Sequence, residues 1–261
     1  MSPPPEALLS LVDDLRSTDP VVRDTGAFTS LAALAVEGRL DRHLVELGVR
    51  AMALLRDEEV QARTFGALLL ALLADRDNMT GAATDAAVHA WVASMVGWYA
   101  DEPDTRGWDA DLGWLHAVAH GSDAIGELAM SPRLGRTMLI DLLHLLVSRT
   151  ISPTTVHWVQ DEDDRVAIAM MAVLGRNLLA VGDVTPELRR LGDTWRTAPS
   201  GPIPAGVDNA VRLSRTLHLQ LTLGVRTSPE AAVAHPAVRD AALRELGGAL
   251  ADMHWFYGRP S

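Results

Sequence analysis

A short segment near the middle of the sequence holds the residues best suited to chemistry. His116, His120 and Asp123 follow one another at intervals of four and three residues, and Glu127 comes four residues later. In a helix this spacing places all four side chains on one face. Two imidazoles one turn apart can ligate one metal ion, and a carboxylate in the next turn can complete the site. The sequence therefore predicts a polar functional face here.

Two kinds of chemistry fit this pattern. A divalent cation such as zinc, iron, manganese or nickel suits a ligand set of His116, His120 and Asp123. Without a metal, either imidazole could act as a general base when Asp123 orients it. The zincin helix shares only the spacing of the two histidines, because its His-Glu-x-x-His motif contains a glutamate that His-Ala-Val-Ala-His lacks. Metal ligation, acid–base catalysis and a purely structural or ligand-contact role all stay open.

Residues outside this pattern extend the candidate site. Arg106 could hold an anionic group, and Trp108 and Trp114 could form the walls of a pocket. The acidic start at residues 161–164 could supply carboxylates, although acids at a helix start are also explained by the helix dipole. His218 lies among leucines, which also fits a buried, hydrogen-bonded histidine. The predicted ligand-binding residues are Arg106, Trp108, Trp114, Glu127, Trp158, Asp161, Glu162, Arg215 and His218.

The composition excludes several reaction classes. The chain has no Cys, and all 23 of its basic residues are Arg, so it has no Lys. Disulfides, thiolate nucleophiles, iron–sulfur clusters and lysine Schiff bases, including those of pyridoxal phosphate (PLP), are therefore excluded. The sequence shows no glycine-rich nucleotide loop or dinucleotide fingerprint, and no flavin or haem signal. The only cofactor that the sequence suggests is a divalent metal.

Charge and hydropathy indicate the class of partner. The net charge of −11 disfavours nucleic acid and anionic lipid as partners. The longest apolar run, Ala67 to Ala74, is far shorter than the roughly 20 residues of a membrane span. Since residues 1–6 do not resemble a signal peptide, we expect a cytoplasmic protein. A small molecule or a peptide is the expected partner, and a basic protein is the alternative.

Helical periodicity runs through almost the whole chain. The segment around the two histidines predicts a helix over about 111–129, with Trp114, Val118 and Gly121 on its packing side. Gly121 would let a neighbouring helix approach closely. No segment shows the sustained alternation typical of a strand.

Similar helix starts recur along the sequence. They lie near Asp19, Asp57, Asp161 and His235, at multiples of about 36 residues, a period typical of stacked helix pairs. We therefore predict an all-α fold of 11–12 helices, a curved HEAT-like α-solenoid in a single domain over residues 1–261. Residues 1–5 would be a flexible lead, residues 196–206 a Pro/Gly-rich loop, and the aromatic segment 253–257 a plug on the last repeat.

The central motif also resembles a known family. Gly113–Asp123 with Arg106-Gly107 before it, the helix starts Asp19–Arg23 and Asp161–Arg165, and the turn Glu37–Leu40 are similar to a bacterial family known as domain of unknown function 2785. The likeness runs from about Ser17 to beyond Arg165 and is weaker after Val181. It implies an all-helical, repeat-like fold. It implies no particular reaction.

These observations lead to one principal expectation for function. A curved helical stack has a concave surface, and such surfaces commonly bind ligands. We expect a binding module with its pocket centred on the helix that contains His116, His120 and Asp123. An enzyme that uses these residues and a protein-interaction scaffold are the two alternatives.

Overall fold

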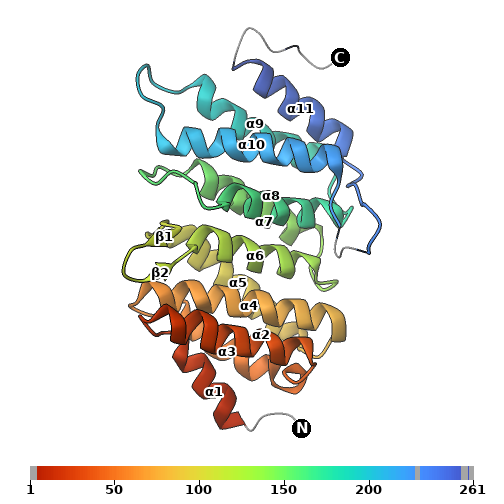
Figure 1. Ribbon diagram of the computed structural model, residues 1–261. Coiled ribbons are helices and arrows are strands. Elements are labelled where there is room, and N and C mark those ends of the chain that lie inside the picture. Colours follow the sequence, from red (N-terminus) through yellow and green to blue (C-terminus); the bar gives the residue numbers. More distant parts are fainter. Residues whose placement is uncertain (1–4, 227–229, 254–257, 259–261) are drawn as a thin grey trace. The chain divides into compact units, whose positions relative to one another are not determined.

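The protein is all-α, as Figure 1 shows for a computed structural model. The structure describes residues 5–226, 230–253 and 258. This part of the chain contains eleven α-helices and one two-stranded sheet, so the predicted all-α class is confirmed. The chain divides into two compact units, residues 1–133 and residues 134–261. The single domain and the HEAT-like repeat stay predictions.

Unit 1 consists of two rows of helices. The first row is α1 (Pro5–Asp14), α3 (Leu44–Leu54) and α5 (Asp85–Asp101). The second is α2 (Thr29–Val36), α4 (Val60–Thr80) and α6 (Ala117–Met130), and α4 packs extensively on both α6 and α3. Short elements connect them: the π-helix η1 (Val21–Phe28), the 3-10 helix η2 (Asp41–His43), and strands β1 (Trp108–Asp109) and β2 (Gly113–Trp114).

Unit 2 is built in the same way. Helices α7 (Arg136–Ile151), α9 (Val181–Arg196) and α11 (Arg239–Ala251) form one row, and α8 (Glu162–Gly175) and α10 (Ala205–Leu223) form the other. Residues 197–204 connect α9 to α10 without regular structure, within the segment 196–206 that the sequence predicts as a Pro/Gly-rich loop.

Close approach of the helices in unit 1 depends on glycine. A Cβ atom on Gly48 of α3 would lie 2.1 Å from Nε1 of the buried Trp91. A Cβ atom on Gly121 of α6 would lie 2.3 Å from Cδ2 of Tyr99, which is 1% exposed. The predicted role of Gly121 is therefore confirmed, because any larger residue would overlap the ring of Tyr99.

Two predictions fall on the chain ends. Pro5 already belongs to α1, and the rest of the expected lead lies outside the described residues. The same holds for residues 254–257 of the expected aromatic plug. No helix within the described ranges combines the length and the apolar character that crossing a membrane requires.

Candidate functional site

The helix with the two histidines begins later than its periodicity predicts. α6 starts at Ala117, whereas the sequence predicts a start near residue 111. Gly113 and His116 both have left-handed backbones, with φ of 74° and 50°, and this conformation interrupts a right-handed helix. The amides of Leu115 and His116 donate to the carbonyl of Gly107 at 3.0 and 3.1 Å, which closes the loop before the helix.

A small hairpin takes the place of the missing helical turns. Trp108 pairs with Trp114, and Asp109 pairs with Gly113, in antiparallel register. The Asp109 carboxylate accepts hydrogen bonds from the amides of Asp111 and Leu112, at 2.9 and 3.0 Å, and so holds the turn. The prediction that Trp114 lies on the packing side of a helix is therefore wrong, and its side chain is 40% exposed.

The hairpin places four rings in a continuous row. Trp108 and Trp114 meet edge to face with ring centroids 4.7 Å apart. Trp114 stacks on His116 at 4.4 Å and 5°, and His116 lies 5.4 Å from His120. Trp108 is 49% exposed, whereas His120 is only 7% exposed. The row therefore leads from solvent into unit 1.

The inner end of the row joins the core. His120 meets Phe65 of α4 edge to face at 5.2 Å, and Phe65 meets Phe28 at 6.0 Å. Because edge-to-face contacts fix the orientation of both rings, His120 is packed as an aromatic core residue. This burial differs from the predicted presentation of His120 on an open polar face.

Arg23 anchors the hairpin to the first helices. Its side chain is fully buried, and its guanidinium donates to the carbonyls of Leu112 and Trp114 at 2.7 and 3.4 Å. It also pairs with Asp24 at 2.7 Å and lies 4.8 Å from the centroid of Phe65. Burial raises the pKa of Asp24, and the charge of Arg23 opposes that rise.

Arg23 is not among the predicted site residues, although the sequence contains a signal for it. Arg23 lies four residues before Ala27, and Leu31 and Ala35 follow at the same interval. All four side chains are at most 1% exposed. A single arginine in an otherwise apolar stripe indicates a buried, hydrogen-bonded charge. The π-helix that contains it is a rare element that is often found at functional sites.

Arg106 has its own carboxylate partners. Its guanidinium donates to Asp104, with the Nε at 2.9 Å, and also to Asp109. These bonds raise the pKa of Arg106 further above its usual range. Burial acts to raise the pKa of Asp104, but the hydrogen bonds from Arg106 lower it overall. Arg106 therefore braces the hairpin rather than presenting a bare charge to an anion.

The carboxylates of α6 form a separate acidic group. Asp123 and Glu127 are half-buried, and Asp75 of α4 lies close enough to act on Glu127. Burial, then the charges of Asp75 and Asp123, raises the pKa of Glu127 to about 7. Among the described residues, no three His, Asp or Glu side chains are grouped so that they could hold a metal ion. His116, His120 and Asp123 therefore do not form such a metal-binding group.

The remaining predicted residues lie in unit 2. Trp158 is buried, and Asn209 of α10 accepts from its amide at 2.9 Å. Asp161 has a left-handed backbone before α8, and Glu162 is buried and accepts from the amide of Gln160 at 2.8 Å. Burial raises the pKa of Glu162. These contacts order the loop before α8. Arg215 is exposed and His218 is half-buried on α10.

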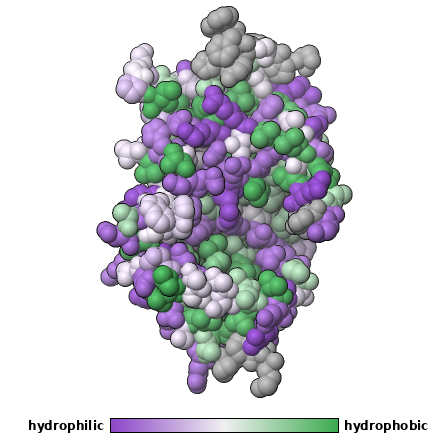
Figure 2. Space-filling view, viewed as in Figure 1, coloured by the Kyte–Doolittle hydropathy of each residue, from purple (hydrophilic) through white to green (hydrophobic). Residues whose placement is uncertain are grey.

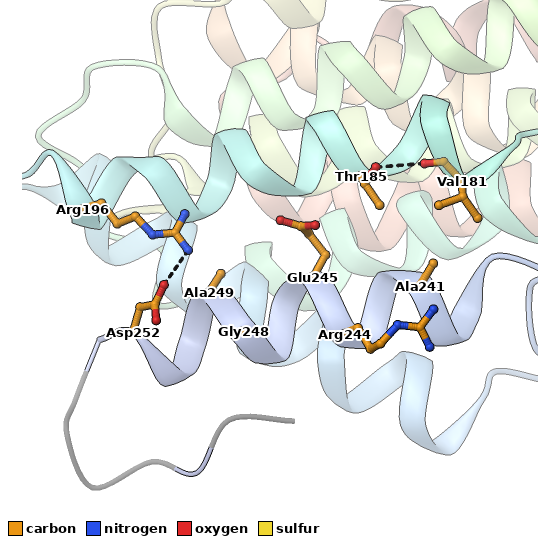
Figure 3. Close-up of a pocket in the computed structure, with 9 residues that line it drawn as sticks. All are labelled: Val181, Thr185, Arg196, Ala241, Arg244, Glu245, Gly248, Ala249 and Asp252. Atoms are coloured by element: carbon orange, nitrogen blue, oxygen red, sulfur yellow. Dashed lines mark hydrogen bonds and ion pairs between the residues drawn. The ribbon is translucent and has the colours of Figure 1, made fainter. Parts of the chain in front are cut away.

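Two cavities lined by described residues lie outside the predicted site. One, of about 370 Å³, lies in unit 2 between α9 and α11 (Figure 3). Its acidic side chains are paired, Asp252 with Arg196 at 2.9 Å and Glu245 with Arg189 at 2.9 Å. The other, of about 360 Å³, lies in unit 1 beside α3, α4 and α5.

Comparison with known proteins identifies the family. The family model described as Protein of unknown function (DUF2785) matches residues 52–219, which is more than half of the chain. The chain belongs to this family. The resemblance of the central motif is thereby confirmed, and the DUF2785 match extends further toward the C-terminus than the motifs do. No curated protein and no solved structure matches the chain. The hairpin, α6 and the cavity of unit 1 all lie within the DUF2785 segment.

Proposed function

We propose that this DUF2785 protein is a binding module whose ligand surface is the pair of exposed rings of Trp108 and Trp114. The observation that carries the proposal is that these rings, 49% and 40% exposed, sit on a short hairpin in a fixed edge-to-face contact. Large apolar rings are normally buried, so two adjacent exposed ones suggest a contact surface.

The rigid support of the hairpin favours binding. Arg23 donates to the carbonyls of Leu112 and Trp114, Arg106 pairs with Asp109 of β1, and His116 stacks on Trp114. A surface that is ordered before binding loses less conformational entropy when the ligand arrives. Polar and apolar side chains mix on the face of unit 1 in Figure 2, with apolar surface over the row of α2, α4 and α6.

The charges around the rings favour a cationic ligand. Arg23 and Arg106 are both engaged by carboxylates, so neither presents a free charge. Asp111 at the hairpin turn is exposed, and its side chain has no hydrogen bond or ion pair with any residue of the described ranges. Ammonium and guanidinium groups bind over the faces of tryptophan rings. A basic peptide, or a small amine, therefore suits this surface and the net charge of −11.

Calorimetric titration with the peptide Gly-Arg-Arg-Gly tests the proposal. We expect it to bind, and a peptide with citrulline in place of arginine to bind about tenfold more weakly, because citrulline has the same shape without the charge. Trp108→Ala should weaken binding by a similar factor. Met79→Ala, at a residue that is 70% exposed on α4, is the matched control and should change nothing. Equal binding of the two peptides, or equal effects of the two variants, would contradict the proposal.

Acid–base catalysis is the second candidate, and Glu127 favours it. A carboxyl group with a pKa of about 7 exchanges protons readily near neutral pH. In this candidate the proton is exchanged by Glu127, whereas the sequence predicts that His116, His120 and Asp123 carry out catalysis. A screen of ester, amide and phosphoester substrates would support catalysis if it found an activity that Glu127→Gln abolishes. We also propose that the helices form a HEAT-like stack and that the protein is cytoplasmic. The two-row packing of helices within each unit supports the HEAT-like stack.

A further inference from the structure

The cavity of unit 1 has a rigid polar wall. Nε and Nη2 of Arg63 donate to the two carboxylate oxygens of Glu102 at 2.6 and 2.8 Å, and Nε1 of Trp98 donates to the same carboxylate at 2.8 Å. Nη1 of Arg63 also donates to the carbonyl of Glu58 at 2.8 Å. Glu102 is 3% exposed and Arg63 is half-buried, so these bonds form a partly buried pair in which each charge neutralises the other.

Two further charges at this cavity have no such partners. Arg56, just after α3, and Asp101, at the end of α5, both line it and both are exposed. Neither side chain forms a hydrogen bond or an ion pair with any residue in the described part of the chain. One unpaired cation and one unpaired carboxylate at the same cavity suit a ligand that carries one negative and one positive group.

Apart from Ser94, the rest of the lining is apolar. It includes Met52, Leu55 and the indole of Trp98. A volume of about 360 Å³ is at the small end of the range for ligand pockets, roughly 300–1,000 Å³. The space therefore suits a small molecule with a compact apolar body.

We propose that this cavity binds a zwitterion with an apolar side chain, which is the chemistry of a free amino acid. The carboxylate of the ligand pairs with Arg56, its ammonium group pairs with Asp101, and its side chain packs on Leu55 and Trp98. The site is independent of the Trp108 and Trp114 surface, because it shares no residue with it.

Calorimetric titration with leucine tests the charge pattern. The two controls are 4-methylpentanoate, which lacks the ammonium group, and 3-methylbutylamine, which lacks the carboxylate. We expect each control to bind at least about tenfold more weakly than leucine, and Arg56→Gln and Asp101→Asn each to weaken leucine binding by a similar factor. In Asp101→Asn, leucine and 4-methylpentanoate should bind almost equally, because the partner of the ammonium group is gone.

A steric variant tests the location. Gly97 lines the cavity from α5, and a Cβ atom there meets nothing within 4 Å, so the side chain of Gly97→Leu can start into the cavity without a clash at its Cβ. It should abolish leucine binding. Gly248→Leu is the matched control, because Gly248 is equally open and lines the cavity of unit 2, and it should bind leucine normally. Phenylalanine is titrated alongside leucine to test a ligand with a larger apolar side chain.

Three results would overturn this proposal. The first is that neither leucine nor phenylalanine binds at about 10 mM, a concentration far above the Kd of a specific site. The second is normal binding by Gly97→Leu. The third is loss of binding in Gly248→Leu, which would place the ligand in the other cavity.

Discussion

At the scale of single residues, Arg23 is a buried cation whose guanidinium donates to two carbonyls of the hairpin region. The sequence separation between Arg23 and Leu112 is 89 residues, so this one side chain connects the first helices to the proposed ligand surface. Removing it leaves those carbonyls and the half-buried Asp24 without their donor.

We expect Arg23→Met to lower the free energy of unfolding by about 3 kcal/mol, since breaking a buried ion pair leaves an uncompensated charge. Urea denaturation measures the change. Arg189→Ala is the comparison, because that arginine is 61% exposed in its pair with Glu245 and its loss should lower the free energy of unfolding far less. Similar losses in the two variants would mean that Arg23 does not hold the hairpin.

The carboxyl group of Glu127 lies near two other carboxylates, those of Asp75 and Asp123. Its pKa is raised from 4.5 to about 7 by burial and by Asp75 and Asp123. Because the folded pKa is above the unfolded one, the charged form is disfavoured in the folded protein. Stability is therefore highest below pH 4.5 with respect to this group, and falls as the pH rises toward 7.

Glu127→Gln should consequently be more stable than the native protein at pH 8, by about 1 kcal/mol after allowance for solvent screening of a half-buried side chain. The difference should disappear near pH 4. Thermal melting across this pH range measures it, and carbon NMR of the Glu127 carboxyl should show the pKa fall when Asp75→Asn removes one neighbouring charge. A pH-independent difference would contradict the burial argument.

At the scale of elements, α5 and α6 approach each other through Gly121. The ring of Tyr99 occupies the space above that glycine, and its hydroxyl hydrogen-bonds with Oγ of Ser122 at 2.8 Å. A ring held at its face and at its hydroxyl has little freedom to move away. This contact fixes α6 against α5, and α6 directly follows His116 and the hairpin.

Gly121→Ala should destabilise the protein by about 1–3 kcal/mol, because the new methyl group overlaps Tyr99. Gly97→Ala, in α5 of the same unit, should instead stabilise it by about 0.5–1 kcal/mol, since its Cβ atom is unobstructed and alanine favours a helix. Circular dichroism melts of the two variants compare the effects directly. If both variants shifted the melting temperature in the same direction, the contact with Tyr99 would not limit the packing.

At the scale of the whole molecule, the DUF2785 segment and the two compact units overlap only in part. Residues 52–219 include α4 to α6 of unit 1 and α7 to α9 with most of α10 of unit 2. Arg23 and α11 lie outside that segment. The net charge of −11 acts over the entire surface, so it would attract a basic ligand from a distance and would be screened by salt.

Much of this protein follows from local sequence pattern. Apolar periodicity determined the all-α class, the Pro/Gly-rich segment determined the loop before α10, and the lack of Cys and Lys limited the possible chemistry. Such features depend on residues within a few turns of one another, or on composition alone. The small size of Gly121 was sufficient to predict a close helix contact.

Only the tertiary structure decided the arrangement of the candidate site. A helical wheel assumes regular geometry, and the left-handed backbones of Gly113 and His116 break that assumption just before α6. The ring row and the cavity of unit 1 join residues from separate helices, and the bond from Arg23 to Leu112 joins residues far apart in the chain. Local pattern cannot specify such contacts, because they exist only after the helices have packed.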